Sequence, residues 1–97
     1  METIIYEYSL DEAIADGVLH QVGWVNGKPL IATAGIMNDL PSGERQRLFA
    51  EFLSWQRDVE PTLPEEERMF TATASNGKRV WVIDDGSAVT LLYPEEY

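Results

Sequence analysis

The chain has 97 residues, no cysteine and a formal net charge of −10, from 17 acidic and 7 basic side chains. This length supports one hydrophobic core, and a hydrophobic content of 44% excludes an intrinsically disordered chain. The missing thiols exclude disulfides and cysteine chemistry, while the acidic balance argues against direct binding to nucleic acid or to an anionic membrane. Without a visible signal peptide or membrane span, we expect a single cytoplasmic domain over residues 1–97.

The N-terminal part predicts a strand followed by a short helix. Residues 3–8 are rich in β-branched and aromatic side chains, which are typical of strands. Ser9 and Glu12 have the spacing of a capping box, in which each side chain satisfies a free backbone N–H of the other residue. The helix that they begin is expected to end at Gly17, which suits the left-handed position after a last turn.

Residues 22–33 predict a β-hairpin. The Asn-Gly pair at 26–27 separates two apolar runs, and both turn residues tolerate a positive φ angle. Pro29 cannot donate a ladder hydrogen bond, so it belongs at an edge or at a strand start. Thr33 or one of its neighbours is placed to cap a short helix that continues to Leu40.

The longest periodic segment predicts a main helix over about residues 43–58, with Ser42 as its N-cap. Leu48, Phe52 and Trp55 repeat at helical spacing, so one face of this helix is apolar and aromatic. Such a face must be covered by the rest of a small domain. We therefore expect this helix to organise the core.

The C-terminal half predicts a three-stranded antiparallel meander with runs at 69–74, 79–83 and 88–93, joined by Asn-Gly and Asp-Gly turns. An exposed Pro- and Glu-rich loop at 58–67 precedes it, and 94–97 is expected to be a tail. The predicted fold is α+β, a mostly antiparallel sheet whose meander packs on the main helix, plus one or two short helices. The expected core residues are Leu48, Phe52, Trp55, Trp81, Ile83 and Leu91.

The residues that carry chemistry are sparse, so we expect no enzyme, no metal and no cofactor. His20 is the single histidine and lies beside apolar residues, where a structural role is the simpler interpretation. Asp84 and Asp85 precede a glycine, as turn residues do, and they lack the regular ligand spacing of a calcium loop. The sequence therefore favours binding over catalysis.

Four blocks carry a family resemblance. The opening at 8–19 reads Tyr-Ser, then Ala-Ile-x-Asp-Gly-Val-Leu, and further blocks lie at 28–40, 47–55 and 84–95. On these blocks the chain resembles a family of small uncharacterised proteins carried on plasmids, phages and other mobile elements. Such proteins are usually longer between the third and last blocks. The resemblance implies a setting among mobile-element genes and implies no activity.

Two binding hypotheses follow. In the first, an acidic surface occupies the basic groove of a nucleic-acid-binding defence protein, as a nucleic-acid mimic of the anti-CRISPR or anti-restriction type does. The carboxylates proposed for that surface form two groups, with Asp58, Glu60, Glu65, Glu66 and Glu67 at one end and Asp84, Asp85, Glu95 and Glu96 at the other. In the second, the chain is a self-associating or scaffold-binding module that pairs through an open strand, with a homodimer as one outcome. Salt separates them, since screening weakens only the first.

Overall fold

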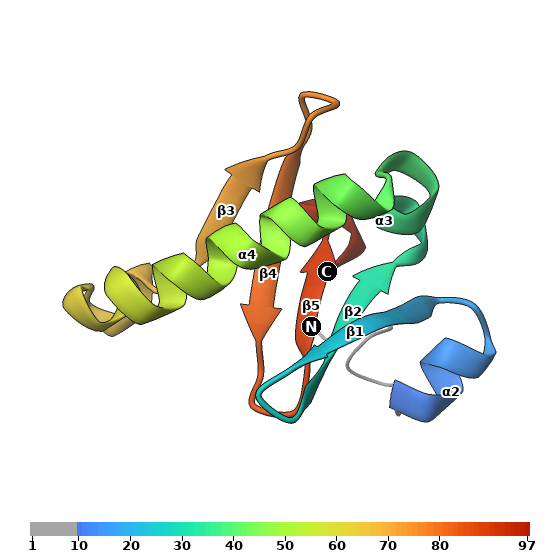
Figure 1. Ribbon diagram of the computed structural model, residues 1–97, viewed down its shortest axis with the longest axis horizontal. Coiled ribbons are helices and arrows are strands. Elements are labelled where there is room, and N and C mark those ends of the chain that lie inside the picture. The colour runs from blue at the N-terminus through green and yellow to red at the C-terminus, as the bar shows by residue number, and fades with distance from the viewer. Residues whose placement is uncertain (1–9) are drawn as a thin grey trace.

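The computed structural model describes residues 10–97, which build a five-stranded sheet in the order β1-β2-β5-β4-β3 (Figure 1). Neighbouring strands are antiparallel, except that β2 and β5 run parallel. This confirms the predicted α+β class and the meander β3-β4-β5, while the strand expected at 3–8 lies outside the described residues. The strands are β1 (Leu19–Val25), β2 (Lys28–Thr33), β3 (Phe70–Thr73), β4 (Arg79–Asp84) and β5 (Val89–Leu92).

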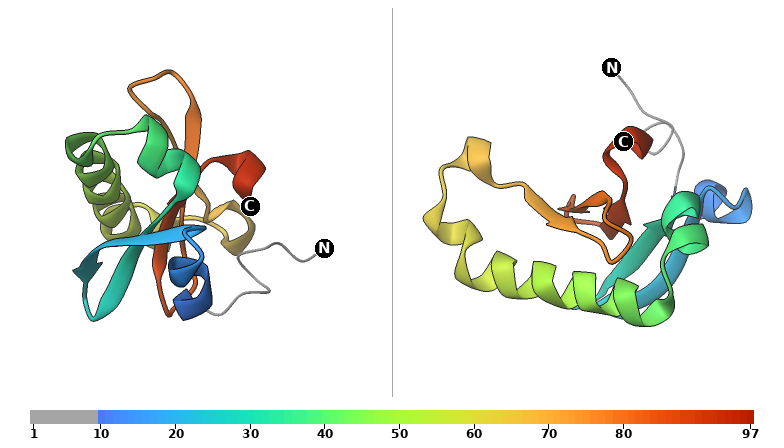
Figure 2. Two further views of the ribbon diagram at one scale, coloured as in Figure 1. Left: turned by 90° about the vertical axis from the view of Figure 1, so that its right-hand side faces the viewer. Right: turned by 90° about the horizontal axis from the view of Figure 1, so that it is seen from above.

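Helices connect and cover the strands. The α-helices are α2 (Leu10–Ala15), α3 (Ala34–Asp39) and α4 (Ser42–Asp58), and the single 3₁₀ turns are η1 (Glu60–Thr62), η2 (Glu65–Glu67) and η3 (Pro94–Glu96). Figure 2 shows α4 along one side of the sheet and η3, with the C-terminus, on the other. Within residues 10–97, no helix combines the length and apolarity that crossing a bilayer requires.

The hairpin β1–β2 forms at the predicted turn. Asn26 and Gly27 have φ angles of 51° and 79°, the positive values that an Asn-Gly turn adopts. Pro29 is paired with Trp24 and precedes the Leu30–Ala32 stretch that pairs with β5, so its missing N–H costs no bond to that strand. After the hairpin, the Thr33 side chain accepts a hydrogen bond from the Ile36 N–H and caps α3 as predicted.

Helix α4 is the expected core helix, with one corrected boundary. The helix begins at Ser42 and Pro41 is its N-cap, so the prediction of Ser42 as the cap is wrong. Pro41 has an extended backbone and its carbonyl accepts the first helical hydrogen bonds from Glu44 and Arg45. The Ser42 hydroxyl instead accepts a hydrogen bond at 3.3 Å from the side-chain amide of Gln46, one turn further along α4.

The main core lies between α4 and the sheet. Leu48, Phe52 and Leu91 are buried there, as predicted. Trp55 is half-buried and contacts the rings of Phe52 and Phe70, with centroid distances of 5.9 and 5.5 Å. The first pair is tilted and the second is edge-on, and together these aromatic contacts extend the core toward the C-terminal end of α4.

Two predicted core residues lie on the other face of the sheet. Val80 and Val82 of β4 pack beneath α4, so the alternation of a strand turns Trp81 and Ile83 away from it. Both are only half-buried, and placing them in the α4 core was wrong. The Trp81 ring contacts Tyr97 at a centroid distance of 5.9 Å.

A second, smaller cluster covers part of that far face. Ala13 of α2 packs with Leu19, Ile31 and Ala88, all of them buried. Ile31 alternates along β2 with Leu30 and Ala32, which belong to the α4 side. The sheet is therefore covered on both faces at β2.

Candidate functional site

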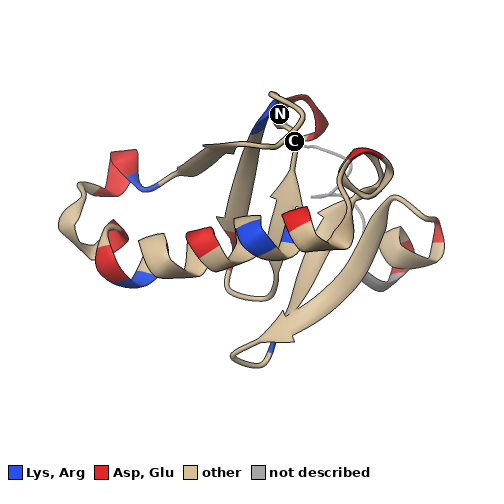
Figure 3. Ribbon diagram, turned by 45° about the horizontal axis from the view of Figure 1, so that its top comes forward, with Lys and Arg blue, Asp and Glu red and all other residues tan. Residues whose placement is uncertain are grey.

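The C-terminal end of α4 and the two following turns gather five carboxylates, and we call this part of the molecule the acidic end. Figure 3 shows the acidic turns at one extremity of the domain. Pro61 is the second residue of η1 and Pro64 precedes η2, so the proline rings break the chain into two single turns. The acidic end consists of Asp58, Glu60, Glu65, Glu66 and Glu67.

The carboxylates of η2 are the least engaged. Glu65, Glu66 and Glu67 are exposed, and among the described residues no ion pair involves them. Asp58 differs, because the Arg57 guanidinium donates to it at 2.9 and 3.0 Å and holds the pKa of Asp58 below its ordinary value. Arg68 donates to the Leu63 carbonyl at 2.9 Å and so closes the segment from its other end.

Asp84 is engaged inside the fold. Lys28 donates to its carboxylate at 2.8 and 3.1 Å, and Gln56 of α4 donates at 3.0 Å. Burial raises the pKa of Asp84, but the hydrogen bonds from Lys28, Gln56 and the Gly86 N–H outweigh it and leave the pKa lowered. This carboxylate ties β2, β4 and α4 together.

Asp85 shapes the β4–β5 turn, as expected of a residue in an Asp-Gly pair. Its Oδ1 accepts from the Ser87 N–H, the Ser87 hydroxyl and the Ala88 N–H, each at 2.9 Å. Burial raises the pKa of Asp85, while these bonds lower it and prevail. Such Asx-type bonding fixes the turn.

The C-terminal carboxylates behave differently from each other. Glu95 is exposed, whereas Glu96 accepts hydrogen bonds from the Thr33 hydroxyl at 2.7 Å, the Tyr93 N–H at 3.0 Å and the Gly35 N–H at 3.2 Å. A Cβ atom at Gly35 would lie 2.6 Å from Glu96 Oε2, so a larger residue there would displace the Glu96 carboxylate from these hydrogen bonds. The segment predicted as a tail is thus fastened to the start of α3.

The nine predicted residues do not form one surface. Five of them constitute the acidic end, but Asp85 precedes β5 and Glu95 follows it, so β5 separates these side chains. Asp84 and Glu96 are half-buried in internal hydrogen bonds. The second acidic group expected from the sequence is therefore not brought together.

Two features were missed by sequence reasoning. The first is a polar cluster in which the Tyr93 hydroxyl donates to Asp39 at 2.8 Å and accepts from Asn76 at 3.0 Å, with Lys78 Nζ 3.7 Å from Asp39. The hydrogen bond from Tyr93 lowers the pKa of Asp39, while burial and Asp39 raise the pKa of Tyr93. The cluster ties the β3–β4 turn to α3, and no short sequence pattern announces it.

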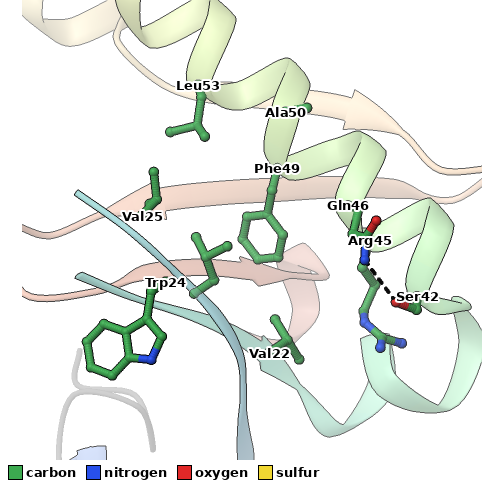
Figure 4. A pocket seen from close by; sticks show the side chains of 10 residues that line it. Val22, Trp24, Val25, Ser42, Arg45, Gln46, Phe49, Ala50 and Leu53 are labelled. Carbon is green, nitrogen blue, oxygen red and sulfur yellow. Dashed lines mark hydrogen bonds between the residues drawn. The ribbon is translucent and has the colours of Figure 1, made fainter. Parts of the chain in front are cut away.

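The second missed feature is an apolar groove of about 230 Å³ between the hairpin β1–β2 and α4 (Figure 4). Trp24 stands at its rim with 66% of its surface exposed. Its apolar lining consists of Val22, Val25, Leu30, Phe49, Ala50 and Leu53, and its polar rim of Ser42, Arg45 and Gln46. In the sequence, the groove is indicated only by Trp24, an aromatic residue that lies close to the Asn26-Gly27 turn and, across the hairpin, opposite Pro29.

His20 lies half-buried on β1, and no group of three or more metal-ligating side chains is present in the described part of the chain. Comparisons of the chain with family models, with curated proteins and with solved structures return no match. The resemblance to mobile-element proteins therefore stays a prediction.

Proposed function

We propose that this protein is a non-enzymatic binding module whose acidic end occupies a basic groove of a partner, as an inhibitor of a nucleic-acid-binding defence protein would. The observation that carries the proposal is the exposure of Glu65, Glu66 and Glu67 without internal ion pairs. The carboxylates of Asp84 and Asp85, by contrast, accept hydrogen bonds from groups within the fold. The free charge of the acidic end is thus available to a partner.

The mechanism is replacement of phosphate by carboxylate. A groove that holds nucleic acid presents Arg and Lys side chains, and Arg grips carboxylates in the same bidentate way as phosphates. Pro61 and Pro64 restrict the backbone that carries the glutamates, so less conformational entropy is lost when a partner binds. The net charge of −10 adds long-range attraction, which speeds encounter with a basic partner.

The test compares two double variants of equal charge change. Glu66→Gln with Glu67→Gln neutralises η2, and Asp16→Asn with Glu95→Gln neutralises two exposed carboxylates elsewhere. Tagged proteins are used for pull-downs from a bacterial lysate, washed at about 0.05 M and then about 0.5 M NaCl, and eluted proteins are identified by mass spectrometry. We expect the wild type and the control variant to retain a nucleic-acid enzyme that elutes with salt, and the η2 variant to lose it.

Competition then decides whether the acidic end acts as a mimic. Added duplex DNA should displace the protein from the recovered enzyme if both use one groove. Retention by the η2 variant equal to that of the wild type, or an empty pull-down from the wild type, would argue against the proposal. The alternative hypothesis, self-association, draws its support from a different surface.

A further inference from the structure

The longest segment without acidic residues coincides with the hairpin. Residues 17–38 contain no Asp or Glu, although the chain has 17 of them. This segment forms β1, β2 and most of α3. Its single Lys or Arg is Lys28, which is already paired with Asp84. In a molecule of net charge −10, a second acidic surface meets the least repulsion here.

The same region presents an apolar projection beside an apolar hollow. Trp24 is the most exposed of the large hydrophobic side chains in the described residues, at 66%. Figure 4 shows its indole pointing away from Phe49 and from the interior of the groove, so the indole does not fill the hollow beside it. Trp24 lies opposite Pro29, on the face turned away from α4, whereas the groove opens on the α4 side.

We propose that the β1 edge of the molecule is a homodimer interface in which Trp24 of each copy inserts into the groove of the other. A projection on one side of this edge and a hollow on the other side can form a twofold, self-complementary contact. The two copies would be related by a twofold axis that lies in the plane of the sheet, along the outer side of β1. This axis reverses the two faces of the sheet in the partner, so the indole of each copy lies on the same side as the partner's groove. Aromatic anchors and few charges are the usual composition of an interface centre.

Charge decides in favour of a second copy over other occupants. A basic partner is attracted to the acidic end, where the carboxylates are. A copy of this chain is itself acidic, so it can approach closely only where carboxylates are absent, and residues 17–38 provide that surface on both copies. The inference is independent of the proposed function, because it uses none of the residues of the acidic end.

Side chains, and not backbone pairing, carry this contact. β1 is an edge strand of the described sheet, but its register shifts between Gln21 and Gly23. A bulge of this kind bends the strand and interrupts the row of backbone groups that a second strand would need. Insertion of the indole requires no continuous ladder.

The experiment is sedimentation equilibrium of the whole chain and its variants at about 0.05 and about 0.5 M NaCl. We expect the wild type to dimerise, and more tightly at high salt because repulsion between the copies is screened. Trp24→Ala should raise the dimer Kd by at least about thirtyfold, which corresponds to about 2 kcal/mol. Met69→Ala, at a side chain that is 46% exposed, is the matched control and should leave the Kd unchanged.

A second pair of variants tests the hollow. Ala50→Glu places a charge in the groove, and Ser54→Glu places the same charge on an exposed position of α4 outside it. Ala50→Glu should be monomeric and Ser54→Glu dimeric. Mixing the Trp24→Ala and Ala50→Glu variants should restore a heterodimer, since one intact indole then meets one intact groove, and native mass spectrometry resolves that species.

Three results would overturn the proposal. They are a wild-type chain that stays monomeric at high salt, a Trp24→Ala variant with the wild-type Kd, and a mixture of variants that forms no heterodimer. Circular dichroism of each variant distinguishes a lost contact from a lost fold. At about 0.5 M NaCl, where repulsion between the copies is screened, Glu66→Gln with Glu67→Gln should dimerise like the wild type, which separates this inference from the acidic end.

Discussion

The acidic end and the hairpin β1–β2 are both exposed regions, but they differ sharply in their content of acidic residues. Residues 58–67 hold five carboxylates, whereas residues 17–38 hold none. Exposed turns and exposed strands would ordinarily share the charge more evenly. The difference teaches that the carboxylates are not spread evenly along the chain, and the two proposals above rest on that unevenness.

Helix α4 belongs to both regions. Phe49 and Ala50, in its N-terminal half, line the groove, while Asp58 at its C-terminal end belongs to the acidic end. The helix runs from α3 to the acidic turns, so its N-terminal half lies away from those turns (Figure 1). Each can therefore be altered without touching the other, provided that the core beneath the helix is intact.

The largest expected effect removes the support common to both regions. Phe52 is 2% exposed and packs against the rings of Trp55 and Phe70. Phe52→Ala should lower the free energy of unfolding by about 3–5 kcal/mol, since it leaves a cavity in the main core. Urea titration followed by circular dichroism measures this loss. A change under about 1 kcal/mol would mean that α4 is not packed as described.

A smaller loss of stability should follow from removing the Asp84 carboxylate, which joins Lys28 of β2 to Gln56 of α4. Asp84→Ala leaves Lys28 and Gln56 without their shared acceptor, at a cost of about 1–2 kcal/mol. The same titration measures it, with Glu95→Gln as a control of equal charge change. An unchanged stability would contradict the role of Asp84 in holding β2 and β4 to α4.

Acid should weaken the contact between Glu44 of α4 and the Ser75 N–H, which follows β3. The hydrogen bonds from Arg47, together with the Ser75 N–H, lower the pKa of Glu44 from 4.5 to about 2. A lowered folded-state pKa stabilises the fold above pH 4.5, and this contribution is lost as the pH falls through about 2. Glu44→Gln should remove it, so the stability of the variant should depend less on pH in that interval. Equal acid dependence of both proteins in thermal unfolding would contradict the assignment.

The smallest effects are expected at the two surfaces themselves. Glu66→Gln with Glu67→Gln and, separately, Trp24→Ala should each change the unfolding free energy of the monomer by at most about 0.5 kcal/mol, because these side chains are exposed. Thermal unfolding at low protein concentration measures both. A loss above about 1 kcal/mol in either variant would identify that surface as structural and remove the contrast between the two regions.

Local patterns predicted most of the fold. The Asn-Gly and Asp-Gly pairs marked the turns, and the spacing of Leu48 and Phe52 marked the helix and its buried face. The misplacement of Trp81 arose because β4 has apolar residues on both faces, so its pattern does not say which face α4 covers. The sequence also did not predict the parallel pairing of β2 with β5. This pairing joins Leu30 to Val89, and no local pattern connects residues so far apart in the chain.

The candidate site was predicted only in part. A run of three glutamates directly after Pro64 is visible in the sequence, and the nearby prolines indicate that it lies in an exposed loop. The internal roles of Asp84 and Glu96 required Lys28 and Thr33, which are remote in the chain. The groove depends on how the hairpin crosses α4, a tertiary relation that neither segment encodes alone.

The position of β5 sets the order in which the molecule can be completed. β5 is the last strand of the chain, yet it lies in the middle of the sheet between β2 and β4. During synthesis the hairpin β1–β2 leaves the ribosome long before its inner neighbour exists, and the strands β3 and β4 lack theirs as well. Such long-range closure is slow and leaves edges exposed. A nascent chain that is stalled before Val89 would therefore hold two separate strand pairs and no continuous sheet.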